Sequence, residues 1–262
     1  MSTVPHVEPL YADSSWRTVE VISDLHLQAS EPLTVQAWQQ YLATSQADAI
    51  FILGDLFEVW VGDDAIEEAG SFEAQCVEVL RAAALKRPMF FMAGNRDFLV
   101  GELFAQRTGL QLMHDPSVLI WNDRRIVLSH GDALCLDDVE YQKFRALSRS
   151  PAWQQQLLSQ PLAVRRAIGK NARSESESQK QSGAIYADAD PAMTQSWMDA
   201  AQAQWLVHGH THRPADHAMP CGRTRIVLSD WHIDAEQQRA QILRLTPSSW
   251  ERVNWLSLPP PV

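Results

Sequence analysis

The feature that most constrains the fold is a series of short apolar runs, each of which ends in polar or glycine-containing sequence. These runs are 18–23, 49–54, 88–94, 125–131, 204–210 and 225–230. Their length, their β-branched and aromatic content and their flanking turn residues favour buried strands over buried helices. Helical patterns near 32–46, 66–86 and 100–108 separate the early runs. The alternation predicts an α/β domain in which helices pack on a sheet.

The segment 137–203 lacks strand-like runs and has the patterns of several helices. Within it, the Ser/Glu/Gln-rich stretch 174–183 predicts a loop, and a further helix is expected near 190–203. We interpret 137–203 as a helical cap inserted into a single domain that spans 1–262.

The two ends of the chain have different patterns. Segments 240–246 and 252–258 are typical of closing β-structure with antiparallel pairing, whereas 1–16 is expected to be a loosely held arm. The first residues lack both a basic start and an apolar signal core, and no apolar run approaches the roughly 18 residues that span a bilayer. Three scattered cysteines agree with a reducing compartment. These features predict a cytoplasmic location.

The charge of the chain is unevenly distributed. The formal net charge is -10, which argues against general nucleic-acid binding, yet the segment 143–180 carries eight Lys/Arg and two Glu. Two interpretations are open. The basic segment is either a solvated helical face or a surface that meets one anionic partner at one place.

Side chains that commonly bind metals follow five of the predicted strands. They are Asp24, His26, Asp55, Asn95, His130, His210 and His212. A single Asp or His is more often a surface or hydrogen-bonding group than a ligand, but seven such groups at strand ends are difficult to explain in that way. Because the carboxyl ends of parallel strands in one sheet converge on one edge, we expect these residues to share a site.

The kinds of ligand restrict the metal. Carboxylate, amide and imidazole groups without a thiolate suit Mn, Fe, Co or Zn better than a structural zinc site. Seven ligands exceed what one ion with an open position would use. Two ions that share a bridging carboxylate would use them well, at a separation of ~3.5–4 Å.

The ordered blocks SDLHL, GDLFE, GNRD, SHGD and HGHTH resemble those of the calcineurin-like metallophosphoesterases. This resemblance implies a four-layer α/β sandwich with a dimetal site at the sheet edge. It assigns Asp24, His26, Asp55 and His212 to one ion, and Asp55, Asn95, His130 and His210 to the other, with Asp55 bridging. By the same resemblance His208 is a buried histidine rather than a ligand.

Arg96 departs from the general family pattern, in which a histidine follows Gly-Asn. An arginine does not donate its proton at neutral pH, because its guanidinium stays protonated there. It would act by charge, holding phosphate oxygens as negative charge develops. This is sufficient when the leaving group is itself a phosphate, so Arg96 favours cleavage of a pyrophosphate.

Longer signatures within 18–232 resemble the pyrophosphohydrolases of UDP-2,3-diacylglucosamine, a family in lipid A synthesis. The resemblance implies two Mn²⁺ ions and attack by metal-activated water on the α-phosphorus, which gives UMP and 2,3-diacylglucosamine 1-phosphate. Asn95 and Arg96 would be catalytic. The implied substrate contacts are Asn95, Arg96, Asp138, Tyr141, Ser174, Lys180 and His210. The cap would bind the acyl chains of this lipid-linked sugar nucleotide and attach a monomer peripherally to the cytoplasmic face of the inner membrane.

Other interpretations of the same residues stay open. Asp138 and Tyr141 are also suited to capping a helix. Asp97 is placed to orient Arg96 by a salt bridge, and Trp60 to line a lipid entrance. A nucleotide phosphodiesterase or a nuclease would use the same metal site, although the acidic net charge and Arg96 speak against both. A partner-binding scaffold with an inactive site is the remaining alternative.

Overall fold

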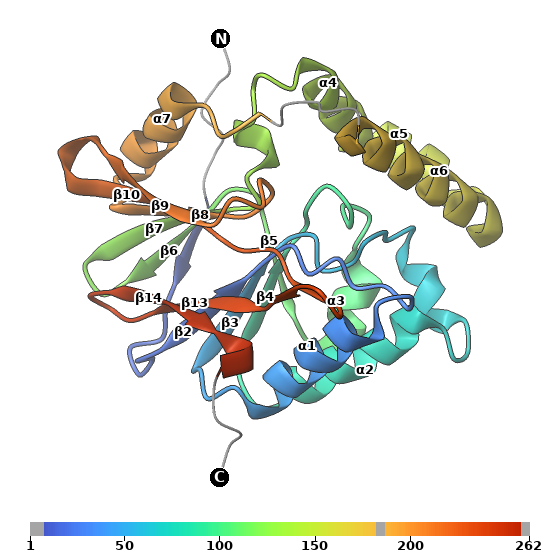
Figure 1. The fold of residues 1–262 in the computed structure, drawn as a ribbon, viewed down its shortest axis with the longest axis horizontal. Helices are drawn as coiled ribbons and strands as arrows, with labels where there is room; N and C mark the ends of the chain where they lie inside the picture. Colours follow the sequence, from blue (N-terminus) through green and yellow to red (C-terminus); the bar gives the residue numbers. More distant parts are fainter. Residues whose placement is uncertain (1–7, 182–186, 258–262) are drawn as a thin grey trace.

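The computed structural model describes residues 8–181 and 187–257, in which two six-stranded sheets face each other (Figure 1). The first sheet has the order β14-β13-β2-β3-β4-β5. Its strands are β2 (Val19–Ile22), β3 (Ala49–Leu53), β4 (Met89–Met92), β5 (Gln111–Met113), β13 (Gln241–Leu245) and β14 (Trp250–Asn254). Strands β2 to β5 pair in parallel, and the C-terminal strands β13 and β14 add antiparallel pairs beside β2.

The second sheet has the order β1-β6-β7-β8-β10-β9. Its strands are β1 (Glu8–Tyr11), β6 (Ser117–Trp121), β7 (Arg124–Ser129), β8 (Trp205–His208), β9 (Ala215–Met219) and β10 (Arg223–Val227). Strand β8 lies between β7 and β10 and is parallel to both. A separate two-stranded hairpin consists of β11 (His232–Ile233) and β12 (Gln238–Arg239).

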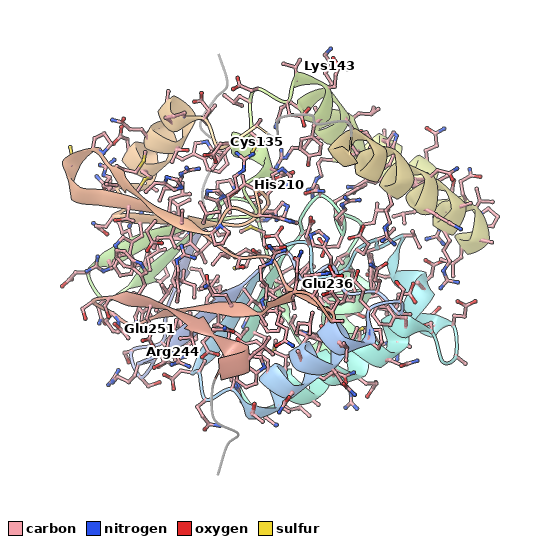
Figure 2. All side chains as sticks on the ribbon, in the orientation of Figure 1. Cys135, Lys143, His210, Glu236, Arg244 and Glu251 are labelled. Carbon is pink, nitrogen blue, oxygen red and sulfur yellow. The ribbon has the colours of Figure 1, made fainter. Side chains whose placement is uncertain are left out.

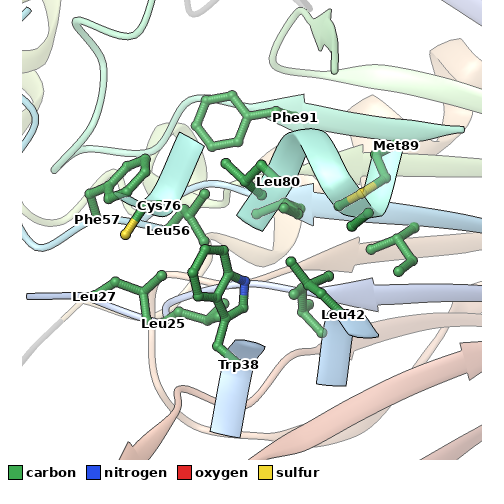
Figure 3. Close-up of a cluster of buried hydrophobic side chains, with 14 of the residues drawn as sticks. Leu25, Leu27, Trp38, Leu42, Leu56, Phe57, Cys76, Leu80, Met89 and Phe91 are labelled. Carbon is green, nitrogen blue, oxygen red and sulfur yellow. The ribbon is translucent and has the colours of Figure 1, made fainter. Parts of the chain in front are cut away.

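Successive side chains of a strand face opposite sides of its sheet, so each strand contributes to two layers of the core. In β3, Phe51 and Leu53 face the second sheet, whereas Ile50 and Ile52 face the helices on the other side. Figure 3 shows the helix-side cluster, in which Trp38, together with Leu42 and Leu80, packs beside Met89 and Phe91 of β4.

Four helices form the outer layers. Helices α1 (Pro32–Thr44), α2 (Phe72–Ala84) and α3 (Glu102–Thr108) cover the first sheet, and α7 (Pro191–Ala201) covers the second (Figure 1). Helix α7 begins where Asp190 accepts a hydrogen bond from the backbone N–H of Met193 at 2.7 Å. Trp197 and Met198 then pack on Val127 of the sheet. The order helix, sheet, sheet, helix confirms the predicted four-layer α/β sandwich.

Three helices stand apart from both sheets, at the upper right of Figure 1. They are α4 (Val139–Ser148), α5 (Pro151–Leu158) and α6 (Leu162–Gln181), and we call them the cap helices. The predicted loop at 174–183 is wrong up to Gln181, because α6 continues through it. Glu, Gln and Lys are good helix formers, and no glycine or proline interrupts this stretch before Gly183. In the described part of the chain, no helix is long and apolar enough to cross a membrane.

Two further expectations are corrected. The metal-binding candidates follow strands of two sheets rather than one, because β2, β3 and β4 belong to the first sheet and β7 and β8 to the second. The N-terminal arm is held at 8–11, where β1 pairs in parallel with β6, while residues 1–7 lie outside the described part.

Candidate metal centre and active site

The carboxyl ends of strands from both sheets meet at one place. Backbone hydrogen bonds join their loops: Asp24 N–H donates to the carbonyl oxygen of Gly54 at 3.1 Å, and Gly209 N–H to that of His130 at 2.9 Å. The N–H of His210 donates to the Asp24 carboxylate at 3.0 Å. Loops of the two sheets are therefore fixed to each other at this edge. Figure 2 labels His210 within it.

The described residues contain two groups of possible metal ligands, and within each group the ligand atoms all lie within 4.8 Å of one another. One group is Asp24, His26 and His212, and the other is Asp24, Asp55 and His130. In the first, His26 Nε2 is 3.2 Å from His212 Nε2, which is 3.4 Å from Asp24 Oδ1. In the second, His130 Nε2 is 3.6 Å from Asp55 Oδ1. Asp24 is common to both groups, whereas the family resemblance gives Asp55 as the bridge.

Asn95 connects His210, the remaining candidate, to the same cluster. Its Oδ1 lies 2.9 Å from His130 Nε2 and 2.8 Å from His210 Nδ1. Asp55 lies between the groups, because its Oδ2 is 3.9 Å from His26 Nε2. All seven candidates therefore form one continuous cluster of oxygen and imidazole nitrogen atoms.

The backbone of this cluster is strained. Five of the seven candidates have left-handed backbone angles without being glycine. These are Asp24 (φ 54°), His26 (φ 48°), Asp55 (φ 51°), His210 (φ 65°) and His212 (φ 52°). Such backbone angles are uncommon for residues other than glycine, and they concentrate at functional sites.

Two glycines permit the close approach of these loops. A Cβ atom on Gly94 would lie 2.2 Å from Asp55 Oδ1, and one on Gly209 would lie 2.2 Å from Asp24 Oδ2. Neither position tolerates a side chain without displacing a candidate ligand. The sequence therefore places glycine where the backbone must pass close to each carboxylate.

The electrostatics of the cluster fit a pair of divalent cations. Burial alone would raise the pKa of Asp24, but His212, His130 and His26 hold it well below its usual range. Burial opposes protonation of His130, yet the charges of Asp55 and Asp24 raise its pKa to about 9. Buried carboxylates thus draw positive charge to this place, and the donor set is one that divalent transition metals prefer.

Asp97 was expected to form a salt bridge with Arg96, but in the structure it binds backbone groups of the centre instead. Its carboxylate accepts backbone N–H groups of Gly94 at 2.7 Å, Leu56 at 2.8 Å and Asp55 at 3.2 Å. Burial and the charge of Asp55 raise its pKa to about 6. Asp97 therefore fixes the two loops that carry Asp55 and Asn95.

Arg96 lines a cavity of about 280 Å³ beside the first ligand group. The cavity is lined by His26, Gln28, Glu31, Glu58, Arg96, Arg173, His212, Asp230, Trp231, His232, Gln237 and Arg239. The backbone N–H of Arg96 donates to Asp55 Oδ1 at 2.8 Å, and its guanidinium lies 3.6 Å from Glu58 Oε1. Sequence reasoning missed Glu58. An acidic residue three positions after a candidate ligand, in a predicted strand-end loop, is the signal that could have identified it.

Of the expected substrate contacts, Tyr141 lies against the cluster. Its ring stacks on His210, with 5.8 Å between the ring centroids, and its hydroxyl donates to Asp132 Oδ2 at 2.5 Å. Asp138 caps α4 by accepting the N–H of Tyr141 at 3.1 Å, which is the alternative role given above. Ser174 and Lys180 belong to α6, but their side chains lie outside the described residues.

Asp132 is a second residue that sequence reasoning missed. It is fully buried and pairs with Arg145 of α4 at 2.8 Å and with Arg149, the residue that follows α4, at 3.6 Å. Arg149 also donates to the carbonyl oxygen of Gly94 at 2.7 Å. Asp132 thus helps to hold α4 beside the candidate centre.

Two other expectations have clear outcomes. His208 is buried beside Arg225, and it belongs to neither ligand group; burial and then the charge of Arg225 lower its pKa to about 3. Trp60 does not line an entrance, because it is 2% exposed and packs on Phe57 and Phe104 in the core.

Comparison with known proteins agrees with this geometry. The sequence profile described as calcineurin-like phosphoesterase matches residues 18–214. A UDP-2,3-diacylglucosamine hydrolase of Stenotrophomonas maltophilia (strain R551-3) is 41% identical over 249 residues, which cover 89% of this chain and 96% of that protein. A protein of the same name from Chromobacterium violaceum is 43% identical over 218 residues, with 82% and 90% covered. The chain therefore belongs to the calcineurin-like phosphoesterase family.

Proposed function

We propose that this chain hydrolyses the pyrophosphate of UDP-2,3-diacylglucosamine to UMP and 2,3-diacylglucosamine 1-phosphate, a step of lipid A synthesis. The observation that carries the proposal is the cavity that Arg96 lines together with His26 and His212 of the first ligand group. Relatives named for this substrate align with 82–89% of the chain at 41–43% identity, which supports the same substrate here.

The proposed cofactor is a pair of Mn²⁺ ions. Asp24, His26, Asp55 and His212 would hold one, and Asp55, Asn95, His130 and His210 the other. Bound there, such ions lower the pKa of a water molecule and neutralise phosphate charge. The oxygen and imidazole donors of the cluster suit this metal.

Arg96 would hold oxygens of the substrate by charge while the bond between the α-phosphorus and the bridging oxygen breaks. The leaving group is a sugar phosphate, which departs as a stable anion and needs no proton from the enzyme. An arginine side chain keeps its positive charge at neutral pH. Asn95, beside it on the loop, is the second proposed catalytic residue.

The cap helices would bind the lipid half of the substrate. Among the described residues, six of the eleven large exposed hydrophobic side chains belong to these helices. They are Val139, Phe144, Leu147, Leu158, Val164 and Ile168. We propose that the inserted cap is confined to the segment from α4 to α6, because α7 packs on the second sheet. Asn95, Arg96, Asp138, Tyr141, Ser174, Lys180 and His210 stay the proposed substrate contacts.

The reaction is tested with UDP-2,3-diacylglucosamine, Mn²⁺ and isotopically labelled water. We expect turnover that a chelator abolishes and Mn²⁺ restores, with the label in UMP. Label in the lipid phosphate would refute attack on the α-phosphorus. Faster turnover of bis(p-nitrophenyl) phosphate than of the lipid substrate would favour a phosphodiesterase.

A further inference from the structure

Glu58 lies on the loop that follows β3, and its side chain is almost completely buried, with 8% of the residue exposed. Its backbone N–H donates to the carbonyl oxygen of Leu27 at 3.2 Å, and that of Trp60 to the carbonyl oxygen of Arg96 at 3.0 Å. The loop is thereby fixed to the segment that carries His26 and to the segment that carries Arg96. A buried carboxylate in such a loop needs cationic partners.

One carboxylate oxygen of Glu58 faces a candidate metal ligand. Oε2 lies 2.8 Å from His26 Nδ1, a buried nitrogen for which the structure shows no aligned hydrogen bond. The carboxylate thus lies within hydrogen-bonding distance of this ring nitrogen. On the opposite side of the ring, His26 Nε2 faces His212 and Asp55. A carboxylate at Nδ1 favours the tautomer whose free Nε2 lone pair points into the ligand group.

The other oxygen faces two arginines. Oε1 lies 3.1 Å from Arg173 Nε of α6 and 3.6 Å from Arg96 of the core. Arg173 also donates to Gln28 Oε1 at 2.6 Å, so it is held at the rim of the cavity. The carboxylate of Glu58 therefore contacts both a candidate metal ligand and the cap helix α6.

Two other arginines of α6 pair with acidic residues away from the centre. Arg165 pairs with Asp64, and Arg166 pairs with Glu68 at 2.5 Å and with Glu73 at 3.5 Å. None of these three acidic residues belongs to a ligand group. Arg173 differs from Arg165 and Arg166, because its ion pair with Glu58 leads to the candidate centre.

We propose that Glu58 is a positioning residue that connects the cap to the centre. One oxygen holds His26 in the orientation in which it ligates a metal, and the other aligns Arg96 together with Arg173 of α6. Placement of the cap and alignment of Arg96 are then linked through a single carboxylate. This inference rests on the proposed dimetal hydrolase.

The test replaces Glu58 by glutamine, which keeps the size of the side chain and removes its charge. In Glu58→Gln we expect one of the two Mn²⁺ ions to bind about 10- to 100-fold more weakly, the usual effect of losing a partner of a ligand. Calorimetric titration of metal-free protein with Mn²⁺ and the manganese content after dialysis measure this. Glu58→Asp keeps the charge and should recover part of the affinity.

Two further variants separate the cap side from the metal side. Arg173→Gln should bind both Mn²⁺ ions with unchanged affinity while kcat/KM for the lipid substrate falls. Glu68→Gln removes the partner of Arg166 and makes the same chemical change in a pair that does not reach the centre. It should match the wild type in Mn²⁺ affinity and in turnover, and thermal unfolding checks that each variant folds.

Unchanged affinity for both Mn²⁺ ions in Glu58→Gln would overturn the proposal. Equal weakening in Glu58→Gln and Arg173→Gln would also overturn it, because Glu58 would then act only by holding the cap. If the wild type binds two Mn²⁺ ions but does not hydrolyse UDP-2,3-diacylglucosamine, the proposed function fails, and the titrations still decide the role of Glu58.

Discussion

At the scale of the residue, Arg96 stands where the resemblance described above implies a histidine after Gly-Asn. Its backbone is fixed by Asp55 and its guanidinium by Glu58, so the charge is held at the cavity beside the candidate metal centre. Asp97, which the sequence suggested as its partner, is occupied by backbone N–H groups. The position of Arg96 thus depends on the same carboxylates that arrange the centre.

Replacing Arg96 by histidine tests the charge-holding role. We expect Arg96→His to lower kcat for the pyrophosphate substrate by about 10²–10³-fold, the usual effect of losing one transition-state donor. Manganese content should be unchanged, because Arg96 is not a proposed ligand. Arg107→His, at an exposed ion pair with Glu67, is the control. Loss of manganese from Arg96→His would instead indicate a structural role.

The buried His208 predicts a pH dependence of stability. Its pKa is about 3 in the folded chain and near the ordinary 6.5 when unfolded, so between these values the unfolded chain binds a proton that the folded chain does not. The stability that neutral His208 contributes is therefore fully present above the pKa of the unfolded chain. Below that pH the free energy of unfolding falls by about 1.4 kcal/mol per pH unit. His208→Asn should reduce this slope. Urea unfolding of metal-free protein at several pH values measures it, and equal slopes would contradict the prediction.

At the scale of the element, the helix α4 is attached to the core through Asp132. Burial would raise the pKa of this carboxylate, but Arg145, His130 and Arg149 hold it well below its usual range. Removing one partner of a buried ion pair leaves the others uncompensated, which costs about 3–5 kcal/mol. Because Arg145 and Arg149 are partly exposed, we expect the lower end, about 3 kcal/mol, for Asp132→Asn.

The measurement is the free energy of unfolding in urea, together with the rate of proteolysis within the cap helices. Glu140→Gln is the matched control, because this residue lies on α4 and pairs with Lys143 at the surface. It should leave both quantities unchanged. Equal stability of the two variants would show that Asp132 does not anchor the helix.

The sequence predicted the central strands and the helices on the first sheet, because buried strands carry continuous apolar runs. It missed β5 and β9, whose partly exposed residues carry no such run, and it also missed β6, although that strand is mostly buried. The apolar pattern alone did not distinguish one sheet from two, since it records burial and not pairing; the four-layer sandwich followed from the family resemblance. The helical extension of α6 was missed because a polar stretch without glycine or proline is compatible with both a loop and an exposed helix.

The candidate site, like the fold, was predicted only in part. Residues such as Asp24 and His212 were recognisable because metal-binding side chains follow predicted strands at regular spacing. Glu58 and Asp132 were not, since their roles come from side-chain contacts that no local pattern shows, of Glu58 with Arg173 and of Asp132 with Arg145. Asp138, which stays a proposed substrate contact, also caps α4, as the sequence allowed.

At the scale of the whole molecule, an acidic chain carries a basic and apolar cap. The formal net charge is -10, yet the cap helices expose Phe144 and Leu147 near cations such as Lys143, which projects from α4 in Figure 2. Anionic lipid would attract the cap and repel the rest of the surface. A protein with this distribution should therefore meet a membrane in one orientation.

Liposome sedimentation tests this orientation. We expect binding to vesicles with anionic lipid, weakening as salt rises from ~0.05 M to ~0.5 M, because screening shortens the reach of the charges. Each cap cation at the surface contributes about 1 kcal/mol, so Lys143→Gln should reduce binding about fivefold. Lys86→Gln should not, because Lys86 lies just after α2 and donates to the carbonyl oxygen of Ala43 at the end of α1 rather than to the cap helices. Binding that does not respond to salt, or that weakens equally in both variants, would show that the cap charges do not direct the chain to the membrane.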